Sequence, residues 1–444
     1  MNFNPISLLL SRRFGAFFVA QFLGAFNDNL YRNALAALLV FGIGMAPVAN
    51  VPVIVNVAAG LFILPFFLFS APFGQLADRG DKAWLVRLSK LLEVLICMVA
   101  GLGLYLGELW LLLAVVFLLG LQSALFGPVK YAILPQLLDE RALIDGNGLV
   151  AAGTYLAILF GTVAGPLVAG IDAAWPWPVF TACLLVAVVG WVAALGVPEV
   201  ARGDPDLVVD WNPLTSTVRC LKVLWTSRML LIAALAVSWF WFYGTVFLVQ
   251  LPTWTQGVVG GDHSVLAATL ALFVIGISAG ALSCARWSRG RVRIGLVVAG
   301  AFGMSLSGLD LWWASPRIAL DQAGIVEVAR SAGSWRWVLD LLAIGFFAGL
   351  YIVPLYTLVQ RLAGDRERAQ AIAALNILNS LFMLLAGGLA VIVLGVLQWS
   401  IPALFALVAA MNLPVAACLV RWRRSGRDRP AVACAATEAA REGG

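Results

Sequence analysis

Twelve apolar segments follow one another along the chain, and each is long enough to cross a bilayer. A spanning helix needs about 20 mostly apolar residues and satisfies its own backbone hydrogen bonds where no water can. Only 12% of the residues are charged and 62% are hydrophobic, which excludes an ordinary soluble domain. The sequence therefore predicts an all-α integral membrane protein with twelve transmembrane helices. They are expected at about 14–42, 53–77, 85–105, 109–132, 144–170, 175–196, 230–256, 265–286, 292–313, 335–360, 370–395 and 400–420.

The basic residues gather in alternate loops between the apolar segments. Loops that stay in the cytoplasm carry an excess of Lys and Arg, so the loops richest in them are expected inside. Of the 29 lysines and arginines, only Arg317, Arg330 and Arg336 fall in outside loops on this assignment. The asymmetry predicts that both termini are cytoplasmic, and it accounts for the net charge of +6 without a nucleic-acid partner. The inside positions are Arg79, Lys82, Arg141, Arg202, Arg219, Lys222, Arg228, Arg286, Arg289, Arg291, Arg293, Arg361, Arg366, Arg368 and the arginines of the tail.

The longest polar interruption divides the chain into six spans and six spans. It supports a division into a six-helix bundle at 1–196, a cytoplasmic charged linker at 197–229 and a second six-helix bundle at 230–421. A six-plus-six layout favours two pseudo-equivalent halves around a central cavity. The remaining residues, 422–444, are polar and small, and we expect a disordered cytoplasmic tail.

Metal and catalytic motifs are missing from the sequence. The six cysteines have neither paired nor metal-ligand spacing, and His263 is the single histidine. An H-x-x-x-x-D acyltransferase site would need an aspartate after that histidine, which is followed by Ser-Val-Leu-Ala-Ala. There is no Walker loop or nucleophile elbow either. We therefore expect no enzyme activity, no catalytic residue, no metal and no cofactor.

The first apolar segment carries a polar stripe, the feature around which the functional prediction is built. Asp28 and Arg32 stand four residues apart on a helix, as do Asn29 and Asn33, so each pair shares a face. Together they are expected to cover one side of the helix and leave the other side to lipid. Ionisable residues inside a membrane are costly and usually face a cavity, so the stripe predicts a gate or binding site. Arg32 is the nearest candidate partner for Asp28.

The loop after the second segment reads Gly74-Gln-Leu-Ala-Asp78-Arg79-Gly-Asp-Lys82. Gly74 would let another helix approach closely, and Asp78 could hold a helix N-terminus or a basic side chain. The spacing G-x-x-x-D-R-x-x-[RK] resembles the major facilitator signature, in the loop where that superfamily carries it. The resemblance implies the major facilitator fold and a conformational latch at Gly74, Asp78, Arg79 and Lys82.

Two further motifs resemble the bacterial lysophospholipid transporter family. They are Ala20-Gln-Phe-Leu-Gly-Ala-Phe-Asn-Asp-Asn29 and Phe126-Gly-Pro-Val-Lys-Tyr-Ala-Ile-Leu-Pro-Gln136, and the similarity continues at 147–149, 349–360 and 376–383. Residues 238–251 look closer to the transporter portion found fused to glycerophospholipid acyltransferases. The resemblance implies an alternating-access transporter in the bacterial inner membrane. It would move lysophospholipid, chiefly lysophosphatidylethanolamine, to the cytoplasmic leaflet for re-acylation, with a functional link to an acyltransferase. We expect a monomer surrounded by membrane lipids.

The same resemblance assigns polar functional positions to Asp28, Lys130 and Lys90. Lys130 lies deep in the fourth span, and a desolvated lysine suits the phosphate of a lysophospholipid, although it could also snorkel toward the headgroups. Lys90 and Glu93 stand three residues apart in the third span. They are predicted either to form part of the site or to make a local ion pair near the inner interface.

The seventh span departs from the family pattern, because 238–250 contains no basic residue where stand-alone members carry an arginine. Arg32 or Lys130 would then have to supply the charge opposite Asp28. An alternative function is a proton-coupled efflux pump for amphipathic drugs, with Asp28 or Glu93 as the proton carrier.

Overall fold

The computed structural model describes residues 5–41, 51–140, 142–171, 176–288, 291–315, 323–331, 333–364 and 367–424. The tail from 425 onward therefore lies outside the described residues, as do Arg141, Arg289, Arg317 and Arg366 of the predicted charge pattern.

Twelve helices of 19 residues or more run through the described part of the chain, at the positions that the apolar segments predict. Ten of them are long and apolar enough to cross a membrane, and the other two, α2 and α4, carry the buried Asp28, Lys90 and Glu93. The twelve are α2 (Gly15–Phe41), α3 (Val51–Arg79), α4 (Lys82–Leu106), α5 (Leu109–Ala132), α7 (Leu143–Ala169), α8 (Trp177–Leu195), α10 (Arg228–Trp254), α11 (His263–Ser288), α12 (Ile294–Ala314), α14 (Ser334–Leu362), α15 (Arg368–Ala390) and α16 (Ile401–Arg424).

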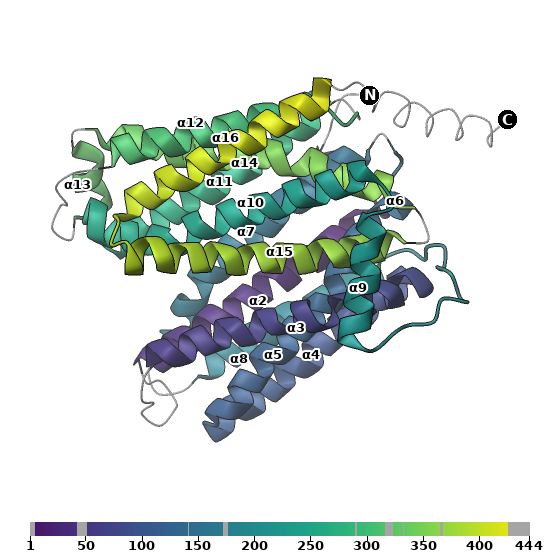
Figure 1. Ribbon diagram of the computed structural model, residues 1–444. Coiled ribbons are helices and arrows are strands. Elements are labelled where there is room, and N and C mark those ends of the chain that lie inside the picture. Colours follow the sequence, from purple (N-terminus) through teal and green to yellow (C-terminus); the bar gives the residue numbers. More distant parts are fainter. Residues whose placement is uncertain are drawn as a thin grey trace.

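The shorter elements lie at helix ends and in the connections. They are α1 (Pro5–Leu9), α6 (Leu134–Leu137), α9 (Pro213–Leu224), α13 (Ile325–Arg330) and the π-helical turns η1 (Thr255–Val259) and η2 (Val391–Val396). Helix α9 lies within the segment that the sequence indicates as a charged linker, and it runs across the long helices at one end of the molecule (Figure 1). This end, where α3 finishes and α4, α7 and α15 begin, is called the α9 end, and the opposite end the far end.

The long helices form two groups in Figure 1. The N half comprises α2, α3, α4, α5, α7 and α8, and the C half comprises α10, α11, α12, α14, α15 and α16. Two pairs of helices make the main contacts between the halves, α3 with α15 and α7 with α11. Small residues allow these approaches: a Cβ on Gly148 of α7 would lie only 2.9 Å from the Ala281 carbonyl oxygen of α11.

The N half contains two separate apolar cores. One, toward the α9 end, includes Phe14, Val86 and Val129, and the other, toward the far end, includes Leu38 and Val116. Between them α2, α4 and α5 each contribute a short polar stretch, at 21–29, 89–93 and 122–123. Since a buried polar group needs a hydrogen-bond partner, these stretches are expected to meet one another. They form a polar layer across the middle of the N half.

Candidate functional site

A buried ion pair forms the centre of the polar layer. Lys90 and Glu93 of α4 lie 2.7 Å apart between Nζ and Oε2, and each side chain is 1% exposed. The second oxygen of Glu93 accepts a hydrogen bond from Asn27 Nδ2 of α2 at 2.8 Å. Gly24 on α2 makes room for the lysine, because a Cβ there would lie 1.9 Å from Nζ. The ion pair is therefore local to α4, and it is buried in the interior of the N half.

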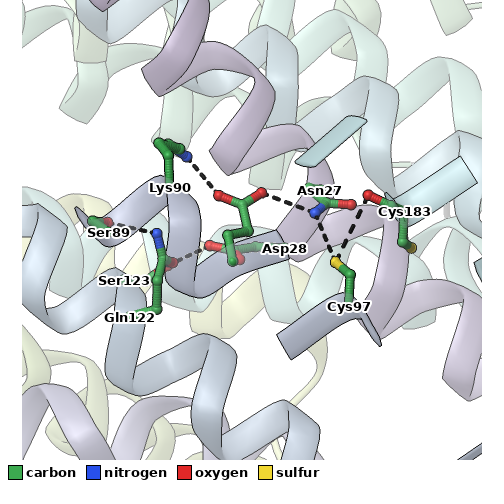
Figure 2. A network of polar contacts seen from close by, with 9 residues as sticks. Asn27, Asp28, Ser89, Lys90, Cys97, Gln122, Ser123 and Cys183 are labelled. Atoms are coloured by element: carbon green, nitrogen blue, oxygen red, sulfur yellow. Dashed lines mark hydrogen bonds and ion pairs between the residues drawn. The ribbon is translucent and has the colours of Figure 1, made fainter. Parts of the chain in front are cut away.

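Asp28 lies in the same layer but is not neutralised by an ion pair. Its Oδ2 accepts a hydrogen bond of 2.5 Å from Ser123 Oγ of α5, and the neighbouring Gln122 donates to Ser89 Oγ of α4 at 2.7 Å (Figure 2). The other oxygen, Oδ1, is buried and has no hydrogen-bond donor among the described residues. Both oxygens of a buried carboxylate normally accept hydrogen bonds. Oδ1 of Asp28 is therefore an acceptor that a ligand could use.

Arg32 does not pair with Asp28. None of the ion pairs between described residues joins the two, and the Arg32 guanidinium instead lies over the Phe62 ring of α3, 4.4 Å from its centroid. The expectation that the other side of the helix is left to lipid is also wrong, since Leu30, Tyr31 and Ala34 on that side are at most 2% exposed. Asn29 and Asn33 face α7, where their Cβ atoms would come within 2.9 Å of a Cβ on Gly161 or Gly165. Because α2 is enclosed by other helices, its polar side chains point in several directions and no side of this stretch is left to lipid.

Lys130 points inward from α5. Its Nζ donates to Thr154 Oγ1 of α7 at 2.8 Å and lies 5.3 Å from the centroid of the Tyr131 ring. Thr154 in turn donates to Gln21 Oε1 of α2 at 3.0 Å. None of the ion pairs between described residues includes Lys130, so its ammonium has only neutral partners here. A half-buried cation of this kind suits an anionic group.

An apolar cavity of about 150 Å³ lies beside this part of α7. Its walls come from the C half, apart from Tyr155, the residue after the one that holds Lys130. The Tyr155 ring contacts Phe240 of α10 edge-on at 6.4 Å. On α10, Gly244 borders the cavity, and nothing lies within 4 Å of the position its Cβ would take. The site thus combines charged groups in the N half with an apolar chamber in the C half.

Asp78 ties the two halves together at the α9 end. Its carboxylate accepts hydrogen bonds from the backbone N–H groups of Ala369 at 2.7 Å and Gln370 at 2.8 Å, in the first turn of α15. Gly74 allows the contact, since a Cβ there would lie 2.5 Å from that of Ala373. Carboxylates are stabilised at helix N-termini by free N–H groups and the helix dipole. The helix N-terminus, one of the two kinds of partner that the sequence allows, supplies these hydrogen bonds.

The other two predicted latch residues, Arg79 and Lys82, differ in their exposure. The Arg79 side chain is exposed, and Lys82 is 2% exposed at the start of α4. Gly80 follows Arg79 in the turn between α3 and α4, and its φ is not positive. The Gly80 carbonyl accepts a hydrogen bond from Gly203 N at 3.2 Å, which fixes the interhelix linker against the loop.

A second polar contact closes the α9 end between α7 and α14. Asn147 Nδ2 donates to Gln360 Oε1 at 2.6 Å, and Gln360 Nε2 donates to the Tyr131 carbonyl at 3.1 Å. One turn away, the rings of Tyr131 and Tyr356 stack with centroids 4.4 Å apart. These residues lie in the motifs that suggested the family, but their contact between halves was not predicted. Ser123 was also missed, although a polar residue inside an apolar span is a signal that can be read from sequence.

Comparisons with known proteins agree with this arrangement. Residues 17–387 match the Major Facilitator Superfamily. The chain is 29% identical over 397 residues to the lysophospholipid transporter LplT of Cronobacter sakazakii, covering 87% of this chain and 90% of that protein. It is 30% identical over 401 residues to LplT of Escherichia coli O157:H7, covering 86% and 88%. The crystal structure of the human organic anion transporter MFSD10 has a similar fold, with a TM-score of 0.69 at 16% identity over 91% of this chain and 99% of that one.

Proposed function

Because the chain belongs to the Major Facilitator Superfamily, and within it to the lysophospholipid transporters, we propose that it moves lysophospholipid across the bacterial inner membrane by alternating access. The proposed cargo is lysophosphatidylethanolamine, carried to the cytoplasmic leaflet where an acyltransferase restores the second chain. The observation that carries the proposal is the juxtaposition of a charged N half with a wholly apolar chamber in the C half.

The charges of the site match those of a zwitterionic headgroup. Lys90 and Glu93 neutralise each other, and the Arg32 guanidinium lies over the Phe62 ring, so Asp28 and Lys130 are the charged groups of the site that we assign to the headgroup. A phosphate can replace Thr154 as the partner of Lys130, and an ammonium can approach the unused oxygen of Asp28. In this arrangement Lys130 faces the phosphate and Asp28 faces the ammonium.

The single acyl chain needs only apolar surface. The cavity beside Tyr155 and Gly244 provides apolar surface for part of that chain. Because the chain moves from the hydrocarbon of the bilayer into an apolar cavity, its binding there requires no polar contact.

The closed α9 end defines the state of the cycle. On the predicted orientation this end faces the cytoplasm, so the Asp78 and Asn147 contacts close the path on the inside. Release of lipid to the inner leaflet then requires that α3 leave α15 and α7 leave α14. Alternating access here means breaking these contacts.

Transport of labelled lysophosphatidylethanolamine into proteoliposomes tests the proposal. We expect Asp28→Asn and Lys130→Met each to lower the flux about tenfold or more, since a hydrogen bond to a charged group contributes about 1.5–3 kcal/mol. Asp310→Asn and Arg330→Met make the same chemical changes outside the site, at the far end and on α13, and should leave the flux unchanged.

Each outcome of that experiment bears on a separate part of the proposal. Flux no higher than in empty liposomes would contradict lysophospholipid transport. Equal flux in wild type and both site variants would contradict the site. Two-chain phosphatidylethanolamine, assayed in parallel, should not move. An imposed proton gradient separates a flippase from a proton-coupled pump, because only the pump loses its flux when the gradient collapses.

A further inference from the structure

Helix α9 carries an exposed apolar stripe that no part of the described chain covers. Leu214, Val218 and Trp225 are spaced by four and seven residues, so they lie on one face of the helix. Their exposed fractions are 79%, 53% and 72%, and Trp211 just before the helix is 58% exposed. A single exposed apolar residue is ordinary, but an aligned row that includes one tryptophan and is preceded by another is typical of an interaction surface.

The opposite face of α9 is fixed to the bundle. Gln75 Nε2 of α3 donates to Ser216 Oγ at 3.0 Å, and the Cys220 thiol donates to the Ala71 carbonyl at 3.6 Å. Helix α9 also packs against α15 and so lies over the seam between the halves. Two different faces of one short helix are thus apolar, one turned to the protein and one turned away from it.

The place of α9 identifies what the outer face meets. Its axis crosses those of α3 and α15 (Figure 1), so in a membrane that surrounds the bundle it runs along the surface. Its contacts on α3, at Ala71 and Gln75, come eight and four residues before the end of that helix at Arg79. At 1.5 Å per residue this is about 12 and 6 Å in from the end. The helix therefore lies against the side of the bundle, at the depth of the headgroup region.

The charges of α9 select one kind of surface. The helix itself carries Arg219 and Lys222 and no acidic residue, and both basic side chains are exposed. On a helical wheel both lie on one side of the apolar stripe, Lys222 next to the stripe and Arg219 between it and the buried face, where Arg219 also pairs with Asp210 at 3.5 Å. An apolar stripe with basic residues and tryptophan beside it is the pattern of a helix that lies in the interface of an anionic membrane.

We propose that α9 is an interfacial helix that inserts Leu214, Val218 and Trp225 among lipid chains while Arg219 and Lys222 bind anionic headgroups. This assigns the segment between the halves a binding surface for acidic phospholipid, separate from the transport site. Since α9 spans α3 and α15, the same attachment holds the bilayer surface against the seam that opens during transport.

The test places an environment-sensitive NBD label on α9 of the full-length protein, in vesicles of phosphatidylcholine with phosphatidylglycerol. Leu214→Cys and Val218→Cys are labelled separately, after Cys418 and Cys434 have been replaced by serine. We expect doxyl-labelled lipid to quench both labels and aqueous iodide to quench neither. Asp206→Cys, on the exposed part of the linker before the helix, is the matched control and should show the reverse.

The opposite result refutes the proposal. Iodide quenching at 214 and 218 equal to that at 206 would show that the stripe faces water, and the surface would then be left for a soluble protein. The charge requirement has its own arm. Phosphatidylglycerol should bury the label at 218 more deeply than phosphatidylcholine alone, and Arg219→Gln with Lys222→Gln should abolish that difference. If the label at 218 is equally deep in the two lipids while Arg219 and Lys222 are present, binding of anionic headgroups is excluded. None of these measurements needs a transported substrate, so they are independent of the flux assay.

Discussion

Replacing Asp78 by asparagine should open the α9 end. The Asp78 carboxylate is 1% exposed and accepts hydrogen bonds from two N–H groups at the start of α15. Hydrogen bonds to a charged group contribute about 1.5–3 kcal/mol each, and a neutral one about 0.5–1.5 kcal/mol. Asparagine can keep one neutral acceptor, while its amide N–H₂ faces the second N–H group. The closed form should therefore lose about 2–4 kcal/mol relative to the open form, which is a factor of about 30 or more in their ratio.

The distance between the halves measures this shift. Spin labels at Arg79→Cys and Glu367→Cys lie on exposed positions beside the latch, one in each half, and double electron–electron resonance reports their separation. Cys418 and Cys434 are first replaced by serine. The remaining native cysteines are buried. We expect a short distance in the parent protein and a second, longer population in Asp78→Asn.

Asp81→Asn provides the control. Asp81 makes the same kind of bond three residues later, to the N–H groups of Ala83 and Trp84, but it caps α4 within its own half. Its substitution should weaken that cap by about 1 kcal/mol and leave the distance distribution unchanged. Identical distributions for Asp78→Asn and the parent protein would refute the latch, as would equal widening in the two variants.

Three further predictions concern single positions. Gly24→Ala should crowd the buried ammonium beside it, lowering both flux and the thermal unfolding temperature, whereas Gly60→Ala, with open space around its Cβ, should change neither. Gly244→Phe should fill the apolar cavity and reduce transport of long-chain lysophospholipid more than short-chain, while Gly257→Phe, which is also unobstructed but outside the cavity, should have no such preference. Burial raises the pKa of the Cys220 thiol to about 12, so between pH 6 and 8 its thiolate fraction, and with it its rate of reaction with maleimide, should stay about a thousandfold or more below that of an exposed cysteine. A rate within about tenfold of that of an exposed cysteine at the same pH would contradict its burial under α9.

The helices could be predicted from sequence because the membrane imposes a simple rule. Every spanning segment must be long, apolar and internally hydrogen-bonded, and the loops must carry the charge. This rule does not predict helix α9 in the interhelix linker, because the charges at 197–229 indicated only a solvated connection. The amphipathic spacing of Leu214, Val218 and Trp225 was readable there, but its twelve residues are too short to register as a span.

The site could be predicted in part. Asp28, Lys90 and Lys130 are visible as charges in apolar segments, whatever the fold. Their partners are not, because Ser123 and Thr154 reach them only through the packing of α5 and α7. For the same reason the contact of the Arg32 guanidinium with the Phe62 ring was not predicted, because it depends on how α3 packs against α2.

The polar layer also affects how the helices insert into the membrane during synthesis. A charged residue near the centre of a helix opposes membrane insertion by about 2.5–3.5 kcal/mol, and α2 and α4 are the two long helices that are not apolar enough to qualify as spans on their own. On α4, Lys90 and Glu93 can neutralise each other as soon as the helix forms. On α2, Asp28 must wait for Ser123, which is synthesised 95 residues later. At about 5–20 residues per second the ribosome needs about 5–20 s to supply it. During that interval the first helix has to remain beside the insertion machinery, so the order of synthesis becomes a requirement of assembly.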